Sequence, residues 1–456
     1  MSVPLLEKEL GIEVYASKTR GIGGRIRRFS EDFTVEEILV DGSEARVSTV
    51  STPKAVGRGR YLVCVLVKRN WDTLQAIRNI ARQLGISGDY IQIAGIKDAE
   101  ALTAQHVSIS CVSGITLDQI SKLKTKDMSL YPQRFSNEKI SSQLLLGNRF
   151  NIKIRAISYS SSIVKRRIEN IIDELADLSG IPNFFGHQRF GTIRPITHKV
   201  GRLIVQRDWE KAALTFLCQS SLYEHPESRK ARQQLQTFQD FKEAQKYFPR
   251  TLQYERSLLS HLARHPRDYV GAFRRLPSKL CKLFVQAYQS LLFNKFLGQR
   301  IRKGIPSNVA QIGDYAIKLD SHGLPTASFT QVTAQSLQSV QKDIDENKIG
   351  IAVPLVGFKQ NLSSGVQGEI EKEILETESL ALEDFKISFI PQMSAPGGLR
   401  TILTPIINFS MGELSEDSAN PSSRALNLGF MLLRGSYATV LLREFMKPRD
   451  LIKAGF

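Results

Sequence analysis

The order of apolar and polar residues predicts several short strands in the first third of the chain. Residues 61–67 form a continuous apolar run rich in β-branched side chains, as in a strand buried on both faces. Apolar residues alternate with polar ones at 91–93 and at 107–109, which predicts two further strands. The same alternation at 150–155 places Arg155 on the polar side, so we expect a half-buried strand with a basic outer face.

Two helices are predicted by apolar residues that recur every three or four positions. The first begins after Asp72, which can cap it together with Gln75, and it ends at Gly85. Its predicted apolar face consists of Leu74, Ile77, Ala81 and Leu84. The second helix covers 163–178 and is closed by Gly180.

Beyond residue 187 the chain becomes helix-rich and its charges gather in clusters. Basic clusters lie at 229–232, 264–275 and 300–303, and an acidic segment covers 369–384. From about 394 onward, glycines again separate short strand patterns. The long middle part therefore differs in character from the two ends.

The composition narrows the possible partners of the protein. The 456 residues include 62 Lys and Arg against 45 Asp and Glu, a formal net charge of +17 that favours a polyanion such as nucleic acid. The four cysteines are far apart and form no CxxC pair, so we expect neither disulfides nor a Cys-type zinc site, and a reducing cytoplasmic compartment. We expect neither a signal peptide nor a membrane span, because no apolar run is long enough.

Two short motifs suggest ligands but fit them poorly. His261 and His265 have the spacing of a zinc-binding helix, yet Leu262 stands where such a site needs Glu, and no third ligand is near. We therefore predict exposed histidines and no metal site. The glycines at 21–24 match no phosphate-binding loop and predict turns beside basic residues.

Two other segments carry residues suited to chemistry. Residues 94–105 place Asp98 on a loop between two predicted strands, where a carboxylate can be presented to a cleft. The alternative is a turn aspartate that caps the residues after it. Residues 181–191 combine three Phe with Asn183 and Arg189, which suits stacking of a nucleobase beside a phosphate-binding arginine. The alternative there is an aromatic cluster beneath a turn.

Six or more separated segments, in order along most of the chain, resemble the motifs of the TruD family of pseudouridine synthases. They are GIGGRIRRFSEDFTVEEI at 21–38, Lys68 with Asp72 and Thr73, AGIKDAEALTAQ at 94–105, GNRF at 147–150, IPNFFGHQRFG at 181–191, VQAYQSLLFN at 285–294 and LRGSYATVLLREFMK at 433–447. Arg27 stands where the family commonly has Lys, and Phe184 where it often has Tyr. The long stretch at 187–393 is most similar to the archaeal and eukaryotic members.

The resemblance implies an α+β fold. A pseudouridine-synthase catalytic core with a curved mixed β-sheet is expected from residues 1–186 and 394–456. An inserted α/β TRUD domain is expected from residues 187–393. The changes in composition near 187 and near 394 agree with this division.

The resemblance also implies an activity, the isomerisation of a uridine in tRNA, usually uridine 13, to pseudouridine. Asp98 stands at the family's catalytic aspartate. The expected substrate-binding residues are Arg27, Phe33, Asn183, Phe185 and Arg189. Because the reaction adds and removes nothing overall, no cofactor and no metal is expected; tRNA is the expected partner, with no membrane and no protein partner. Two alternatives stay open: an enzyme of this fold that acts mainly on another RNA, and a non-catalytic RNA-binding protein.

Several contacts are expected on this basis. Arg27 should form an ion pair with Asp98, since a cation offsets the cost of placing a carboxylate in a cleft. Asn183 should hydrogen-bond Asp98 or the base, and Phe185 should stack on the uracil once it has left its helix. Four arginines in the middle part should follow the RNA backbone: Arg264, Arg267, Arg274 and Arg275.

Overall fold

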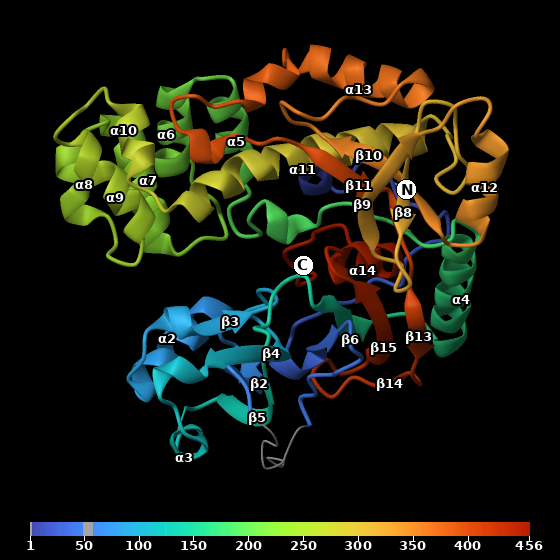
Figure 1. Cartoon of the computed structure of the whole chain (residues 1–456), viewed down its shortest axis with the longest axis horizontal. Helices are drawn as coiled ribbons and strands as arrows, with labels where there is room; N and C mark the ends of the chain where they lie inside the picture. Colours follow the sequence, from blue (N-terminus) through green and yellow to red (C-terminus); the bar gives the residue numbers. More distant parts are fainter. Residues whose placement is uncertain (1, 49–57, 124) are drawn as a thin grey trace.

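A computed structural model describes residues 2–48, 58–123 and 125–456. In Figure 1, a large sheet with its helices fills the lower half of the view, and a helical region with a second sheet fills the upper half. Strands from both the first 157 residues and residues 407–433 belong to the large sheet. The two ends of the chain therefore fold together, and the long middle part lies above them.

The large sheet has nine strands and is mixed. Its order is β13-β15-β6-β1-β4-β2-β5, with β14 beside β15 and β3 beside β4. β1 and β4 are parallel, whereas β1 with β6 and β2 with β4 are antiparallel. The expected α+β fold with a curved mixed sheet is confirmed. The strands are β1 Phe33–Leu39, β2 Tyr61–Arg69, β3 Ile91–Ile93, β4 Leu102–Ser110, β5 Met128–Ser136, β6 Leu145–Ile157, β13 Ile407–Met411, β14 Ser415–Glu416 and β15 Arg424–Leu433.

The helix after β2 forms as its capping residues predict. α2 (Thr73–Leu84) begins after Asp72, whose Oδ1 accepts a hydrogen bond from the Gln75 amide at 2.9 Å. It ends at Gly85, which has the left-handed φ of 68° that glycine adopts without strain. The prediction for Leu74 was wrong, because this side chain is 46% exposed. The buried face includes Thr73, Ala76, Ile77 and Ile80. Leu74 is next to Thr73 in the chain but lies outside this face.

The expected basic outer face at 150–155 is also corrected. Arg155 is only 7% exposed, and its guanidinium pairs with Asp32 at 2.8 Å and with Asp417 at 2.9 Å. These carboxylates come from segments far from β6 in sequence. Strand alternation identifies a polar side, but it does not show whether distant carboxylates will cover that side.

The upper half consists of helices around one long buried helix, α11 (Ser278–Arg302), which is accompanied by a four-stranded sheet of order β11-β10-β8-β9. The prediction that this stretch is helix-rich is confirmed. A small pair, β7 with β12, connects the two halves. Besides α2, the helices that come from outside residues 187–393 are α1 Leu5–Glu9, α3 Leu117–Ser121, α4 Ser161–Asp177 and α14 Ala438–Met446. The elements of the upper half and the pair are β7 Ile181–Pro182, α5 Thr197–Val205, α6 Trp209–Cys218, α7 Pro226–Phe238, α8 Phe241–Tyr247, α9 Gln253–Leu262, α10 Tyr269–Arg274, β8 Tyr315–Leu319, β9 Pro325–Gln331, α12 Leu337–Asp345, β10 Ile349–Leu355, α13 Gly365–Thr377, β11 Gly398–Thr401 and β12 Leu403–Thr404.

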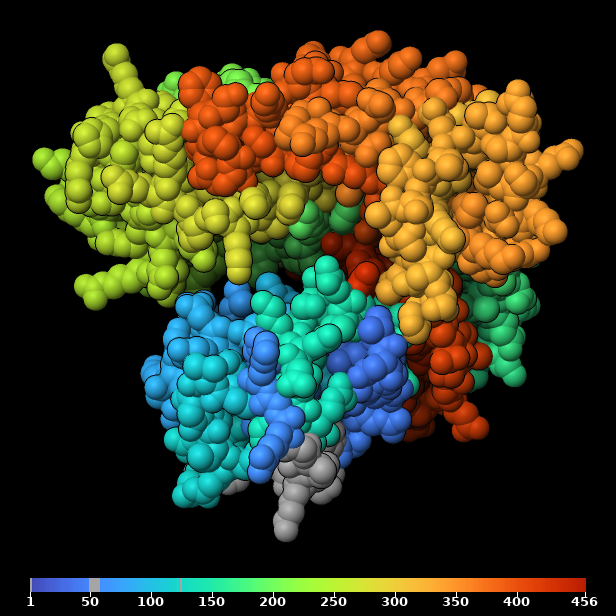
Figure 2. Space-filling view, in the orientation of Figure 1, coloured from blue at the N-terminus to red at the C-terminus, as the bar shows by residue number. Residues whose placement is uncertain are grey.

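The two halves meet along a hollow in the molecular surface. Figure 2 shows it as a recess between the blue and cyan lower part and the yellow and green upper part. In Figure 1, β3 and β4 lie on the side of the lower part that faces this recess. Within the described ranges, none of the helices has both the length and the apolar character needed to cross a membrane.

Candidate active site

The loop between β3 and β4 carries Asp98 at the place where two parallel strands begin. β4 is in register with β1 from the pair Thr34 and Leu102, so the end of this loop lies beside the start of β1. The side chain of Asp98 is 28% exposed, and its Oδ1 accepts a hydrogen bond from Nη2 of Arg27 at 2.8 Å. The expected ion pair is present, and its carboxylate remains open to solvent in part.

Arg27 is itself held on three sides. Its Nη1 donates to the carbonyl oxygen of Gly455 at 3.1 Å, and its guanidinium lies 3.9 Å from the ring centroid of Phe33. Phe33 is 1% exposed, so it forms a buried base for the guanidinium. The backbone of Arg27 has a φ of 55°, a conformation that non-glycine residues seldom adopt. The orientation of this cation is therefore determined by its surroundings.

Two buried lysines support the loop that carries Asp98. Nζ of Lys68 donates to the carbonyl oxygens of Asp98 and Trp71, both at 2.8 Å. Burial lowers the pKa of Lys68 to about 8, an effect that the charge of Asp98 partly offsets. Nζ of Lys97 lies 2.7 Å from Oε1 of Glu37, and both side chains are buried.

Glu37 extends this support beneath the loop. Its Oε2 accepts a hydrogen bond from the backbone amide of His106 at 2.8 Å and lies 3.2 Å from Nδ1 of that ring. Burial raises the pKa of Glu37, but the contacts with His106 and Lys97 outweigh this effect, so the net pKa is lowered. An ionised glutamate thus anchors Lys97, the residue next to Asp98 in the chain.

A second group of expected site residues surrounds Phe185. Its backbone amide donates to Oδ1 of Asn294 at 2.8 Å, and its ring is 5.5 Å from that of Phe293 and 6.2 Å from that of Tyr437. The guanidinium of Arg400 lies 4.1 Å from the centroid of the Phe185 ring. Only 9% of Phe185 is exposed, so neighbouring side chains cover most of the ring that was expected to stack on a base.

Asn183 does not contact Asp98. Its Nδ2 donates to the carbonyl oxygen of Thr401 at 3.0 Å, and its Oδ1 accepts from Nη2 of Arg400 at 2.6 Å. Of the two expected partners of Asn183, Asp98 is therefore not the one it binds here, and a hydrogen bond to the base stays a prediction. β7 pairs with β12 here, and the backbone amide of Asn183 donates to the carbonyl oxygen of Ile402 at 2.8 Å, so Asn183 lies beside the end of β11.

Two arginines in this second group lack a carboxylate partner. Among the residues that the structure describes, neither Arg189 nor Arg400 forms an ion pair: Nε of Arg189 donates to the hydroxyl of Ser290 at 3.0 Å, and Arg400 also donates to the carbonyl oxygen of Gly435 at 2.8 Å. Burial lowers the pKa of Arg189 and lowers that of Arg400 to about 10. Desolvated guanidinium groups without a counter-ion suit an anionic or carbonyl ligand.

A short loop after β15 connects the two groups. Arg400 binds the carbonyl oxygen of Gly435, and the neighbouring Arg434 donates to the carbonyl oxygen of Leu145 at 3.2 Å. The side chain of Leu145 packs against Gly95, since a Cβ built on that glycine would lie 3.7 Å from Cδ2 of Leu145. Gly95 and Asp98 are in the same loop. The groups do not touch directly, but one chain of contacts joins them.

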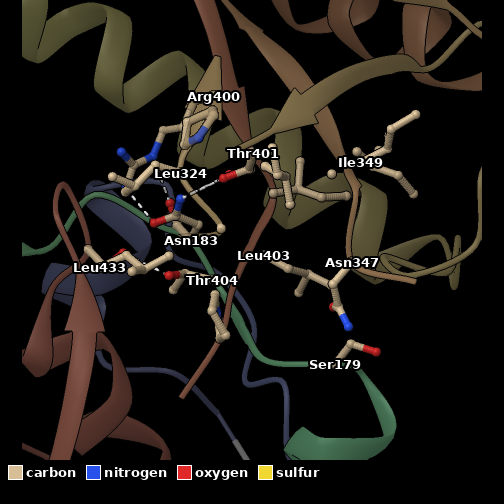
Figure 3. A pocket seen from close by; sticks show the side chains of 18 of the residues that line it. Ser179, Asn183, Leu324, Asn347, Ile349, Arg400, Thr401, Leu403, Thr404 and Leu433 are labelled. Carbon is tan, nitrogen blue, oxygen red and sulfur yellow. Dashed lines mark hydrogen bonds between the residues drawn. The ribbon is translucent and has the colours of Figure 1, made fainter. Parts of the chain in front are cut away.

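Asn183 and Arg400 also line a pocket of about 490 Å³. Figure 3 shows both side chains at one end of it, with Thr401, Thr404 and Leu433 nearby and Asn347 and Ser179 at the other end. Its walls come from both sheets, and the β8–β9 hairpin supplies Leu324. Nothing in the sequence predicted this pocket, because its walls lie far apart along the chain.

Sequence reasoning missed several residues of this site. Arg400 and Asn294 were not singled out, although Asn294 closes a motif that the resemblance identified. Lys68 entered the prediction only as part of a motif. A lysine at the end of a buried apolar strand was the sequence feature that could have identified it as a site residue. No group of three or more His, Cys, Asp or Glu side chains within the described parts of the chain could hold a metal ion.

Comparison with known proteins agrees with the architecture. The profile of the family described as tRNA pseudouridine synthase D (TruD) matches residues 9–445. Proteins named "Probable tRNA pseudouridine synthase D" from Methanosarcina barkeri and Methanosarcina acetivorans are 39% and 40% identical to this chain, with 98% of both chains covered in each case. The crystal structure of a TruD protein from Methanosarcina mazei superposes with a TM-score of 0.81 at 37% identity, covering 98% of this chain and 99% of the other. The chain belongs to the TruD family of pseudouridine synthases.

Proposed function

We propose that this protein converts a uridine of tRNA, at position 13, to pseudouridine, with Asp98 as the catalytic carboxylate. The observation that carries the proposal is the partly exposed carboxylate of Asp98, paired with Arg27 at 2.8 Å on a loop whose backbone is held by buried Lys68. A turn aspartate of purely structural importance would not need a buried lysine beneath it and a fixed arginine in front of it.

The carboxylate can serve the reaction in two ways. As a nucleophile it would attack C1′ of the ribose, forming an ester while the bond from C1′ to N1 breaks. As a base it would take the C2′ proton to give a glycal and later return that proton. In either route the uracil turns and C5 bonds to C1′; in the first route this breaks the ester bond and frees the carboxylate. The C5 proton is then lost as N1 gains one. Atoms and electrons balance, so no external reductant or oxidant enters.

Arg27 would hold the carboxylate of Asp98 in one orientation for either route. Its planar fork binds the carboxylate and Gly455 at once, which leaves the other carboxylate oxygen for the sugar. Phe33 keeps the guanidinium in place from below.

The second group of residues would receive the displaced nucleotide. We propose that Arg189 and Arg400 bind its phosphate or the uracil carbonyls, with Asn183 and Phe185 positioning Arg400. A nucleotide in a duplex must leave its stack to reach such a site. We further propose that residues 1–186 and 394–456 act as the catalytic part and that residues 187–393 act as an inserted RNA-binding part.

The test is Asp98→Asn, measured in single turnover at saturating enzyme with an unmodified tRNA transcript. Asn has nearly the same shape but cannot act as nucleophile or base, so we expect turnover to fall by roughly 10³ or more while RNA binding remains. Glu100→Gln is the matched control, because Glu100 is an exposed carboxylate in the same loop. If Asp98→Asn keeps activity within tenfold of wild type, the assignment is wrong.

The same assay separates the two alternatives. A wild-type protein that binds the transcript but forms no pseudouridine would be a non-catalytic RNA-binding protein. A protein that modifies rRNA or mRNA fragments faster than tRNA would be an enzyme of this family with another substrate.

A further inference from the structure

A second hollow in the surface lies between the two ends of the chain, away from the pocket in Figure 3. It has a volume of about 860 Å³. One wall is the segment from Lys18 to Gly24, and the other is the segment from Met446 to Ala454. We call this hollow the terminal groove.

The terminal groove is strongly basic. Its lining includes Lys18, Arg20, Lys447, Arg449 and Lys453, against a single carboxylate, Asp450. Asp450 lies 3.8 Å from Lys453 and so offsets one of these charges. Among the residues that the structure describes, the exposed side chains of Lys18, Arg20 and Arg449 have no ion-pair partner within 4 Å.

The walls of this groove are fixed rather than loose. The backbone amides of Ile22 and Gly23 donate to the carbonyl oxygens of Phe445 and Met446 at 2.8 and 3.1 Å. A Cβ on Gly21 would lie 2.5 Å from the Met446 carbonyl oxygen, so only glycine permits this approach. Nζ of Lys447 donates to the carbonyl oxygen of Ser17 at 2.7 Å, which directs that cation inward as a support.

A series of hydrogen bonds connects one wall of the terminal groove with the loop that carries Asp98. Ala454 lines the groove, and its carbonyl oxygen accepts a hydrogen bond from the amide of Ile26 at 2.9 Å. The next residue, Gly455, binds Arg27, and Arg27 binds Asp98. A chain of successive phosphates lying in the groove would therefore approach Asp98 from the side of Arg27.

We propose that the terminal groove binds the phosphodiester backbone of the substrate RNA next to the nucleotide that is modified. This inference rests on the proposed function and adds a binding surface to it. Unpaired cations on fixed walls suit a polyanion, because they give up no partner when a phosphate arrives and they release counter-ions from the RNA. The glycine-rich turn at 21–24 and the C-terminal segment would thus act together in binding RNA.

The test is the double variant Arg20→Gln/Arg449→Gln, binding an unmodified tRNA transcript between 50 and 200 mM KCl. Removing two cations that neutralise phosphates should flatten the plot of log affinity against log salt by roughly 1.4–1.8. Over that range the affinity of the wild-type protein should fall about tenfold more than that of the double variant. The control is Lys342→Gln/Lys372→Gln, which removes two exposed cations on α12 and α13. Equal melting temperatures would show that all three proteins are folded.

The position of the contact is tested with the RNA itself. A neutral methylphosphonate at a phosphate beside the target uridine should weaken binding of the wild type and leave binding of the double variant nearly unchanged, because the two changes remove the same contact. A salt slope in the double variant equal to that of wild type would overturn the proposal, and so would an equal flattening in the control.

Failure of this inference is distinguishable from failure of the proposed function. If the wild type forms pseudouridine but the double variant keeps its salt slope, only the groove is refuted. If the salt slopes of the wild type and the double variant differ as expected but the wild type forms no pseudouridine, RNA binding by the groove is supported and the proposed activity is refuted. If the wild type does not bind the transcript, both are refuted.

Discussion

The guanidinium of Arg27 holds the carboxylate of Asp98. The arginine side chain is 10% exposed, and its Nη2 lies 2.8 Å from Oδ1 of Asp98. Arg27→Met should move the acidic limb of the kcat/KM profile to higher pH, because a nearby cation favours the ionised carboxylate. Arg27→Lys should restore most of the position of the limb, with a lower rate from poorer alignment. The measurement is kcat/KM against pH below saturation.

The neighbouring Arg28 provides a matched control for that experiment. It is exposed, and its guanidinium lies 6.0 Å from the ring of Phe29. Arg28→Met should therefore leave the acidic limb of the kcat/KM profile in place. The competing interpretation is that Arg27 binds a phosphate of the RNA. That interpretation predicts weaker binding, a shallower salt dependence and an acidic limb that does not move.

Phe185 illustrates how a stacking residue and a core residue can be told apart. Phe185→Leu keeps an apolar side chain of similar size, so the cost in stability should stay below about 1.5 kcal/mol. It removes the ring face on which Arg400 lies. If the ring positions the nucleotide, a loss of about 1–3 kcal/mol should lower kcat/KM roughly 5- to 150-fold. Phe185→Tyr should retain most of the rate, whereas an unchanged rate in the folded Leu variant would favour a core role.

At the scale of elements, the turn between α9 and α10 presents two exposed arginines, Arg264 and Arg267. Arg274 nearby is exposed as well, but its Nη2 is engaged by the carbonyl oxygen of Phe389 at 2.8 Å. Arg264→Gln/Arg267→Gln should flatten the salt dependence of tRNA binding by roughly 0.7–0.9 for each phosphate that the variant no longer neutralises. Filter binding across a salt series measures this slope. An unchanged slope would mean that this turn faces away from the RNA.

At the scale of the whole molecule, a buried ion pair joins the two ends of the chain. Both carboxylate oxygens of Glu7 in α1 accept hydrogen bonds from Arg443 in α14, at 2.8 and 2.9 Å. Burial raises the pKa of Glu7, but the charge and hydrogen bonds of Arg443, together with the His187 ring whose Nε2 lies 3.4 Å from Oε1, outweigh it and lower the pKa to about 2. Because the folded pKa lies below the unfolded value of 4.5, this stabilisation is present above pH 4.5 and is lost as the pH falls toward 2.

Glu7→Gln should therefore lower the free energy of unfolding by about 3 kcal/mol at pH 7. The difference from wild type should shrink as the pH falls from 4.5 toward 2. Urea unfolding at several pH values measures both effects. Glu9→Gln is the control, because Glu9 lies on the same helix but pairs only loosely with Lys199 at 3.8 Å. A difference that stays constant with pH would show that the ionisation of Glu7 is not linked to folding.

The sequence by itself determined the local elements and the place of the central carboxylate. β2 and α2 formed where the apolar pattern and the capping residues predicted them, since strand runs and helix caps depend on near neighbours. Asp98 stands on the predicted loop, and the family motifs paired it with Arg27. The net charge of +17 indicated a polyanionic partner before any geometry was known.

Only the tertiary structure decided which distant segments cover these elements. The pattern along a strand marks a polar side but does not identify the residues that cover that side. Arg155 was therefore expected at the surface, whereas it is buried against Asp417. Arg400, which lies on Phe185 and binds Asn183, is more than two hundred residues away from both. The terminal groove has walls from the two ends of the chain. Such contacts depend on sheet register and on the packing of elements remote in sequence, and neither is encoded in the local period of apolar residues.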